Sequence, residues 1–276
     1  MATCIDIRNN MAIGVLALSV TLPCCGCGRS QQEPGEEAAR EASSDSILQP
    51  DDDGKTVVEK ALKVVGDEKA LSQWKCGIVK YKTKGASVPG KSTECEMEDT
   101  FQLPGRFRRV MRAISEGKNV SILYVYNHGE GWIKKEGAPA EPVEMDFAER
   151  VEHPFAEYSR WPMLRGNEFQ RIGPSGERVD GEVVIGVQVR PTGLEPFDCF
   201  FARQTGLMLK FTNTVPAKNP NEPSTLYTFL RDYKQVQGCM VPMRIERIRQ
   251  GETLVEVRIF HLEFTSTLDE SLFAKP

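Results

Sequence analysis

The chain has 276 residues, a net charge of −4 and 40% hydrophobic residues. Its acidic excess is concentrated in residues 28–54, and the remainder is close to neutral. This composition argues against nucleic acid, or any other strongly charged molecule, as the partner.

An export signal is predicted at the N-terminus. The apolar run that begins at Met11 follows a short head containing Arg8, and it is shorter than the ~18 residues that a spanning helix needs. It ends in a cysteine cluster, where Gly26 precedes Cys27. Because a small residue before cysteine resembles the lipobox of bacterial lipoproteins, we expect residues 1–27 to be a signal peptide and Cys27 to be acylated. An uncleaved signal that serves as the anchor is the alternative.

Residues 28–54 contain only Ile47 and Leu48 as bulky apolar residues. Such a segment cannot bury a core, so we expect a flexible acidic tether, followed by a folded domain at residues 55–276. The domain should open with a helix, because Thr56 and Glu59 have capping-box spacing and apolar residues then recur at helical intervals until Gly66.

From Trp74 the apolar period changes to two, and turn residues separate the runs. The strands expected from this pattern are 77–83, 92–103, 107–114, 120–126, 132–133, 183–189, 196–202, 207–212, 226–233, 240–249 and 254–264. Between them, residues 143–164 carry a helical apolar stripe that Pro154 kinks. This helix would cover the sheet or act as a lid over a cavity.

Short, regularly spaced strands with few helices predict an α+β, mainly β fold. A sheet of about ten antiparallel strands must curl to bury one face. We therefore expect a strongly curved antiparallel sheet, an open half-barrel, wrapped around a few helices.

The domain contains four cysteines that an exported chain could oxidise. They are Cys76, Cys95, Cys199 and Cys239. Three pairings are open, and Cys76 with Cys95 is favoured because these residues lie on successive strands. Buried thiols are the alternative for Cys199 and Cys239.

Catalytic motifs are missing from the sequence. The three histidines, His128, His153 and His261, share no ligand-like spacing, and neither a nucleophile elbow nor a phosphate-binding loop occurs. The sequence predicts a protein that is not an enzyme and needs no metal or cofactor.

Two sets of binding residues are predicted. Arg106, Arg108 and Arg112 share one strand face and could meet lipid headgroups, although a solvated outer face is the alternative. The candidates for lining a cavity are Tyr124, Phe147, Val151, Phe155, Val187 and Phe260. The alternative is that these six side chains fill the core.

Several short motifs are spread through residues 55–276. They are Leu103–Arg108, Asn127–Trp132, Arg203–Leu207, Asp232–Gly238, Val241-Pro242 and Leu268–Phe273. In this order and spacing they resemble the LolA/LolB family of bacterial lipoprotein-localisation proteins. The resemblance implies a half-barrel whose apolar cavity accepts acyl chains. Leu103 stands where the carriers have a basic residue, so the ligand-release role of that residue is not carried over.

These features predict a membrane-anchored, non-catalytic binding protein of the bacterial cell envelope that holds an acyl chain or other apolar ligand and acts in lipoprotein or lipid transport. The expected partners are this apolar ligand or a lipoprotein, and the membrane through the N-terminal anchor. Gly28 is not acidic, which by analogy favours the periplasmic side of the outer membrane. The alternative function is a structural or protein-interaction module with a filled core.

Overall fold

The computed structural model describes residues 46–88, 91–103, 105–115, 118–143, 164, 167–173, 176–191, 195–215 and 224–276. The predictions for Cys27, Phe147, Val151 and Phe155, and for a kinked helix at residues 143–164 apart from its two end residues, lie outside these residues. No helix within the described ranges is long and apolar enough to span a membrane.

The described helices and strands follow the predicted order closely. They are α1 (Gly54–Val65), α2 (Glu68–Ser72), η1 (Gln73–Lys75), β1 (Cys76–Val88), β2 (Lys91–Gln102), β3 (Arg106–Ser115), β4 (Lys118–Asn127), β5 (Glu130–Lys135), β6 (Glu141–Pro142), β7 (Glu168–Ile172), β8 (Arg178–Val179), β9 (Glu182–Arg190), β10 (Phe197–Ala202), β11 (Met208–Val215), β12 (Ser224–Val236), β13 (Cys239–Arg249), β14 (Glu252–Phe264) and η2 (Glu270–Phe273).

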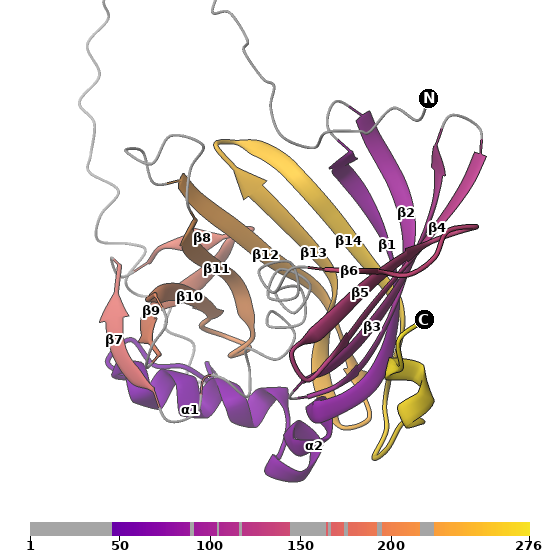
Figure 1. Cartoon of the computed structure of the whole chain (residues 1–276). Helices are drawn as coiled ribbons and strands as arrows, with labels where there is room; N and C mark the ends of the chain where they lie inside the picture. Colours follow the sequence, from indigo (N-terminus) through magenta and orange to yellow (C-terminus); the bar gives the residue numbers. More distant parts are fainter. Residues whose placement is uncertain are drawn as a thin grey trace, which may run out of the picture. The chain divides into compact units, whose positions relative to one another are not determined.

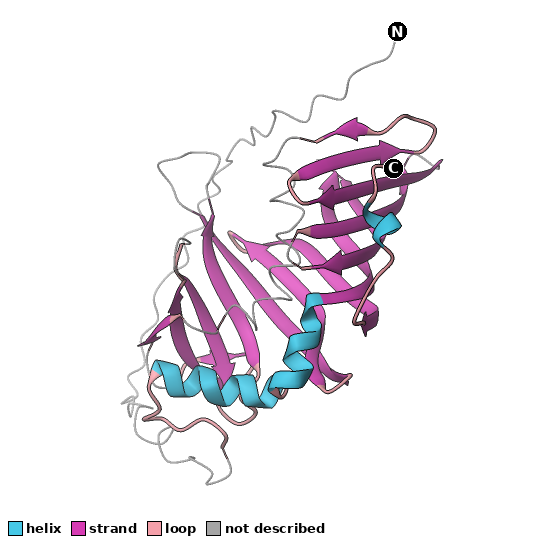
Figure 2. Cartoon of the chain, turned by 60° about the horizontal axis from the view of Figure 1, so that its bottom comes forward, coloured by secondary structure: helices cyan, strands magenta, loops and turns pink. Residues whose placement is uncertain are grey.

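The strands form a single antiparallel sheet of 14 strands in the order β6-β5-β4-β3-β2-β1-β14-β13-β12-β11-β10-β9-β7, with β8 paired to β9. The first and last long strands, β1 and β14, are therefore neighbours in its middle. The sheet ends in β6 on one side and β7 on the other, so it is not closed into a barrel. It bends strongly, and α1 runs across one end of the strands (Figures 1 and 2). The predicted open, curved antiparallel sheet with few helices is confirmed.

The N-cap of helix α1 lies three residues before Thr56, the N-cap that the capping box predicts. Asp53 is its N-cap, and the Asp53 carboxylate accepts a hydrogen bond of 2.7 Å from the backbone N–H of Thr56. Val57, Ala61 and Val65 recur every four residues and are buried, so one stripe of the helix packs against β7, β9 and β13. The helix ends at Gly66, as the sequence predicts.

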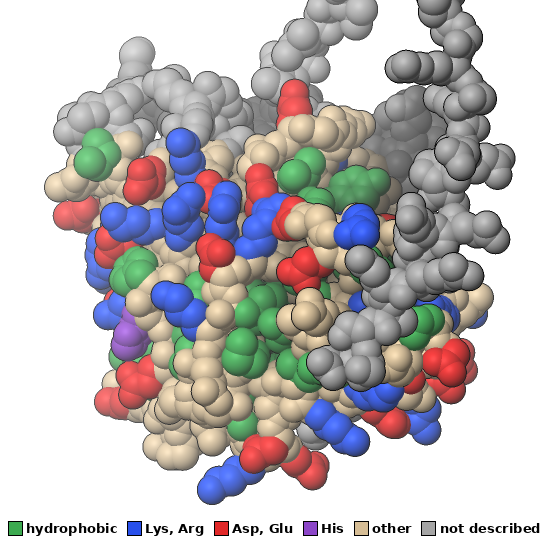
Figure 3. Space-filling view, turned by 180° about the vertical axis from the view of Figure 1, so that it is seen from behind, with side chains coloured by type: hydrophobic (Ala, Val, Ile, Leu, Met, Phe, Trp, Pro, Cys, Tyr) green, Lys and Arg blue, Asp and Glu red, His purple; other side chains and the backbone are tan. Residues whose placement is uncertain are grey.

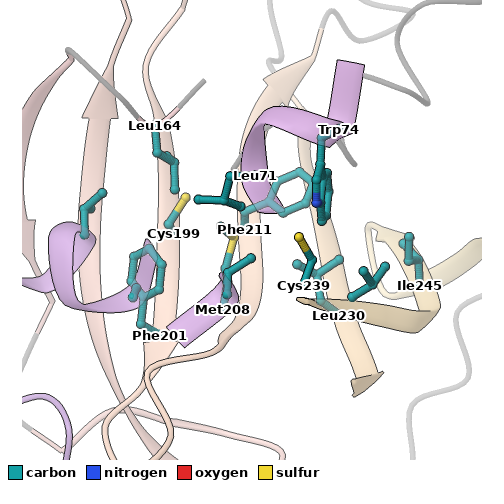
Figure 4. Packing of buried hydrophobic residues seen from close by; sticks show 14 of the residues in the cluster. Leu71, Trp74, Leu164, Cys199, Phe201, Met208, Phe211, Leu230, Cys239 and Ile245 are labelled. Atoms are coloured by element: carbon teal, nitrogen blue, oxygen red, sulfur yellow. The ribbon is translucent and has the colours of Figure 1, made fainter. Parts of the chain in front are cut away.

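The core lies between this helix layer and the sheet. Its largest fully buried side chains include Phe101, Phe107, Phe201 and Phe211. Figure 4 shows Leu71 and Trp74, from the short helices, lying among Phe211, Leu230 and Cys239 from the strands. Burial of these large apolar side chains is the main source of stability.

Residues 46–54, which were expected to belong to the tether, pack against the folded domain. The backbone N–H of Leu48 donates to the carbonyl of Arg203 at 3.0 Å, and the Leu48 side chain is fully buried. Asp52 accepts hydrogen bonds from the Lys60 ammonium at 2.8 Å, and its carbonyl accepts one from Arg171 at 2.8 Å. The C-terminal part of the acidic segment is thus held to the domain by the buried Leu48 and by the hydrogen bonds of Asp52.

These contacts predict an acid-sensitive contribution to stability from Asp52. Burial raises the pKa of this carboxyl, but hydrogen bonds from Lys60 and from the N–H of Gln49 outweigh it, so the pKa is lowered in the folded state. The contribution is present above the unfolded pKa of about 3.9 and is lost as the pH falls through the folded pKa. Asp52→Asn should be less stable than wild type in urea at pH 7, and the gap should close below about pH 4. The exposed neighbour gives the control, Asp51→Asn, and a gap that stays constant with pH would contradict this origin.

The favoured disulfide between Cys76 and Cys95 is wrong. Cys76 lies opposite Gln102 and Cys95 opposite Thr83, so the two cysteines sit about seven residues, or about 23 Å, apart along β1 and β2. A disulfide needs Cα atoms within about 7 Å. All four described cysteines, including Cys199 and Cys239, are buried thiols.

The thiol assignment predicts that reductant has no effect on the domain. Burial raises the pKa of the Cys76 and Cys239 thiols, which keeps them protonated and unreactive in the folded state. The thermal unfolding midpoint of the domain should therefore be the same with and without dithiothreitol. A clear fall in the midpoint on reduction would reveal a disulfide within it.

Candidate functional site

The side of the sheet that faces α1, α2 and η1 is called the inner face, and the opposite side the outer face. On β14, β1, β2, β3 and β4, the register places inner-face side chains in four rows across the strands. In the direction of β1, the rows are Phe264-Gly77-Phe101-Phe107-Tyr126, then Leu262-Val79-Asp99-Arg109-Tyr124, then Ile259-Tyr81-Met97-Met111-Ile122, and finally Val257-Thr83-Cys95-Ala113-Val120.

The apolar side chains of β2 and β3 become smaller from row to row. The first row has Phe101 and Phe107, which are fully buried against the core. The third row has Met97 and Met111, and the fourth has Cys95 and Ala113, of which Met111 and Ala113 are only partly buried. Helix α1 contacts β7, β9 and β13, η1 contacts β14, and η2 contacts β3 and β4. Beyond the phenylalanine row, the inner face continues as apolar side chains, of which Met97 and Cys95 are buried.

A charged pair interrupts this apolar surface in the second row. Arg109 and Asp99 form a bidentate ion pair, with Nε to Oδ1 at 2.7 Å and Nη2 to Oδ2 at 2.6 Å. The hydroxyl of Tyr81 donates to the same Oδ2 at 2.9 Å. The Asp99 side chain is 1% exposed and the Arg109 side chain 12%. The pair is thus buried on its carboxylate side and more accessible on its guanidinium side.

The surroundings of Arg109 keep it charged. Burial alone would lower the pKa of the guanidinium, but the charge of Asp99, the hydrogen bonds that Arg109 donates to it and the nearby Tyr81 and Tyr124 together outweigh burial, so the pKa is raised. The guanidinium also lies 5.1 Å from the ring centre of Phe107. Burial raises the pKa of Tyr124, the neighbour of Arg109 on β4, so its phenol is neutral at pH 7. The site therefore combines one fixed ion pair with neutral hydroxyl groups.

The three predicted headgroup residues, Arg106, Arg108 and Arg112, share the outer face of β3, as their spacing predicts. Arg106 pairs with Glu270 at 3.0 Å, and Arg108 lies 3.8 Å from Glu98. Seen from behind, the molecule has positive and negative side chains interspersed on its surface (Figure 3). Contact between these arginines and lipid headgroups stays a prediction of the sequence.

The described cavity candidates have different positions. Tyr124 lies on the inner face beside Arg109 and is partly buried. Val187 is fully buried in the core of β9, opposite Cys199. Phe260 is 54% exposed and lies at a bulge of β14, where the register with β1 shifts. Because alternation from the buried Ile259 turns Phe260 outward, the prediction that Phe260 lines the cavity is corrected.

Arg109 and Asp99 were not predicted as site residues. The sequence does indicate the position of Arg109. Successive side chains of a strand point to opposite faces, so Arg109, at an odd-numbered position, must face away from Arg106, Arg108 and Arg112. Asp99 follows from the hairpin register, which places residue 99 opposite residue 109. A charged residue at an inward position of an otherwise alternating strand is the feature that indicates such a site.

Comparison with known proteins gives structural matches only. No model of a protein family matches the sequence, and no curated protein matches it significantly. The LolA superfamily protein NE2245 from Nitrosomonas europaea has a TM-score of 0.54 and 11% identity, over 81% of this chain and 98% of that chain. An outer membrane lipoprotein-sorting protein domain from Vibrio parahaemolyticus, described as putative, has a TM-score of 0.47 and 14% identity, over 79% and 97% of the two chains. The chain therefore has the LolA-superfamily fold, as the resemblance in its motifs implies.

Proposed function

We propose that this chain is a membrane-anchored, non-catalytic binding protein of the bacterial cell envelope. It holds an acyl chain or another apolar ligand against the inner face of β1–β4 and acts in lipoprotein or lipid transport. The observation that carries this proposal is the gradient in size of the apolar side chains on the inner face, from Phe101 and Phe107 to Cys95 and Ala113. The LolA-superfamily fold supports the same class of ligand.

The energetics of this surface suit a hydrocarbon chain. Each methylene group removed from water contributes about 0.8 kcal/mol, so an acyl chain of about twelve carbons could gain up to about 10 kcal/mol before the costs of binding. Met97 and Met111 have flexible, polarizable side chains, which adapt to ligands of irregular shape. A surface of this kind requires no reactive group.

The anchor part of the proposal rests on the sequence. Acylation of Cys27 would tether the domain to the periplasmic side of the outer membrane, with the acidic segment before residue 46 as the linker. Cells grown with radiolabelled palmitate should label the wild-type chain, and Cys27→Ala should abolish the label. Equal labelling of both chains would exclude Cys27 as the acylated residue.

Binding at the inner face can be tested with a pair of tryptophan variants. Ala113→Trp places a bulky side chain in the fourth row, whereas Ile114→Trp places the same side chain on the exposed outer face one residue away. The wild-type chain and Ile114→Trp should bind a fluorescent fatty acid with micromolar or better affinity, and Ala113→Trp should bind it at least about tenfold more weakly. Equal binding by the two variants would place the ligand elsewhere.

A further inference from the structure

The Asp99–Arg109 pair lies on the inner face of the sheet, opposite to the ion pairs of the neighbouring residues on β1, β2 and β3. Lys80 and Arg108 pair with Glu98 on the outer face, and Arg106 pairs with Glu270 there. Asp99, one residue after Glu98, turns inward and is the least exposed carboxylate among the described ion pairs. Both charges therefore stand in the surface proposed to receive the ligand.

Stability alone does not explain an ion pair at this position. Moving two charges out of water costs several kcal/mol for each ion, and apolar side chains of similar volume are often as stable or more stable. The neighbouring rows show that this sheet can fill the same positions with Phe101 and Phe107, or with Met97 and Met111. A role in binding accounts for the presence of charged side chains in the Asp99–Arg109 row and in no other of the four rows.

The hydrogen bonds fix Arg109 and leave part of it available. A guanidinium has five N–H donors, and the bidentate bond to Asp99 uses one on Nε and one on Nη2. Within the part of the chain that the structure describes, the Nη1 donors have no acceptor. Tyr81 holds the carboxylate from the other side, so the guanidinium is positioned before any ligand arrives.

The charges select the chemistry of the polar group that can bind there. The pair is neutral overall, so a full anion near Arg109 would also meet the repulsion of Asp99. A neutral acceptor gains the charge-assisted hydrogen bond without that repulsion. We propose, on the basis of the proposed function, that Arg109 binds the carbonyl oxygen of an acyl ester or amide. The hydrocarbon chain of this ligand then lies along the row of Met97 and Met111.

Two commercial probes that differ in one carbonyl group test this proposal. They are palmitoyl lysophosphatidylcholine, which has an ester linkage, and its ether-linked analogue. Calorimetric titration of the full chain below the micelle concentration should give a dissociation constant for the ester about tenfold lower than for the ether. In Arg109→Met combined with Asp99→Leu, the two constants should become equal, through weaker binding of the ester alone. Lys80→Met, on the outer face, should keep the tenfold ratio.

The outcomes separate this inference from the proposed function. If neither probe binds the wild-type chain, both fail. If both probes bind the wild-type chain equally, or if the double variant keeps the preference for the ester, the inference is overturned and the proposed function stands. The wild-type comparison needs no variant. If the double variant does not fold, Arg109→Lys keeps a cation facing Asp99 but lacks the Nη1 donors, and it should reduce the ratio at least threefold.

Discussion

Replacing Asp99 with alanine should lower the free energy of unfolding by about 3–5 kcal/mol. The substitution leaves the guanidinium of Arg109 on the inner face without its carboxylate, and only 12% of that side chain is exposed. An uncompensated charge at such a site costs far more than the loss of an ordinary contact. Urea unfolding at pH 7, followed by tryptophan fluorescence, measures the change.

The adjacent residue gives a matched control. Glu98 also forms ion pairs, at 3.2 Å to Lys80 and 3.8 Å to Arg108, but it lies on the outer face. Glu98→Ala should therefore cost less than about 1 kcal/mol. Combining Asp99→Leu with Arg109→Met should recover most of the stability lost in Asp99→Ala, because no charge is then left buried. Equal losses for Asp99→Ala and Glu98→Ala would contradict the inward position of the pair.

Trp74→Ala should also cost about 3–5 kcal/mol. The Trp74 side chain is 3% exposed, and its ring stacks on Phe264 with 5.3 Å between the ring centres. It joins the short helix η1 to β14, next to the point where β1 begins. The substitution would leave a cavity between the helix layer and the sheet, which the surrounding strands cannot close.

A second tryptophan shows whether this loss is specific. Trp132 lies on β5, close to the edge of the sheet, and is only partly buried. Trp132→Ala should cost about 1 kcal/mol or less. Thermal or urea unfolding of both variants tests the difference, and a comparable loss at the two positions would show that Trp74 does not anchor the helices to the sheet.

The strands could be predicted from the sequence because their two faces differ in polarity. In β3, for example, Phe107, Met111 and Ala113 alternate with arginines, and the observed strand exceeds the predicted one by only one residue at each end. The packing of residues 46–54 against the domain was harder to predict. Leu48 stands in a polar, acidic segment, and its partner Arg203 is far away in the chain.

The candidate site depended on register, which the sequence encodes less directly. The alternation of side chains along β3 places Arg109 on the inner face. To predict its partner, however, one must also know the length of the turn between β2 and β3, which sets the register. The same dependence explains the failed disulfide, since Cys76 and Cys95 are on neighbouring strands but in distant rows. Phe260 was misplaced because a bulge adds one residue to β14, which a strict period of two does not allow for.

Native mass spectrometry of the full chain, extracted from its own membrane in mild detergent, tests most directly whether the inner face holds an apolar ligand. The account predicts an additional mass of one amphiphile beyond that of the processed polypeptide, retained in Ile114→Trp and absent from Ala113→Trp. Spectra that show the polypeptide alone for the wild-type chain, or the same added mass for both variants, would contradict it.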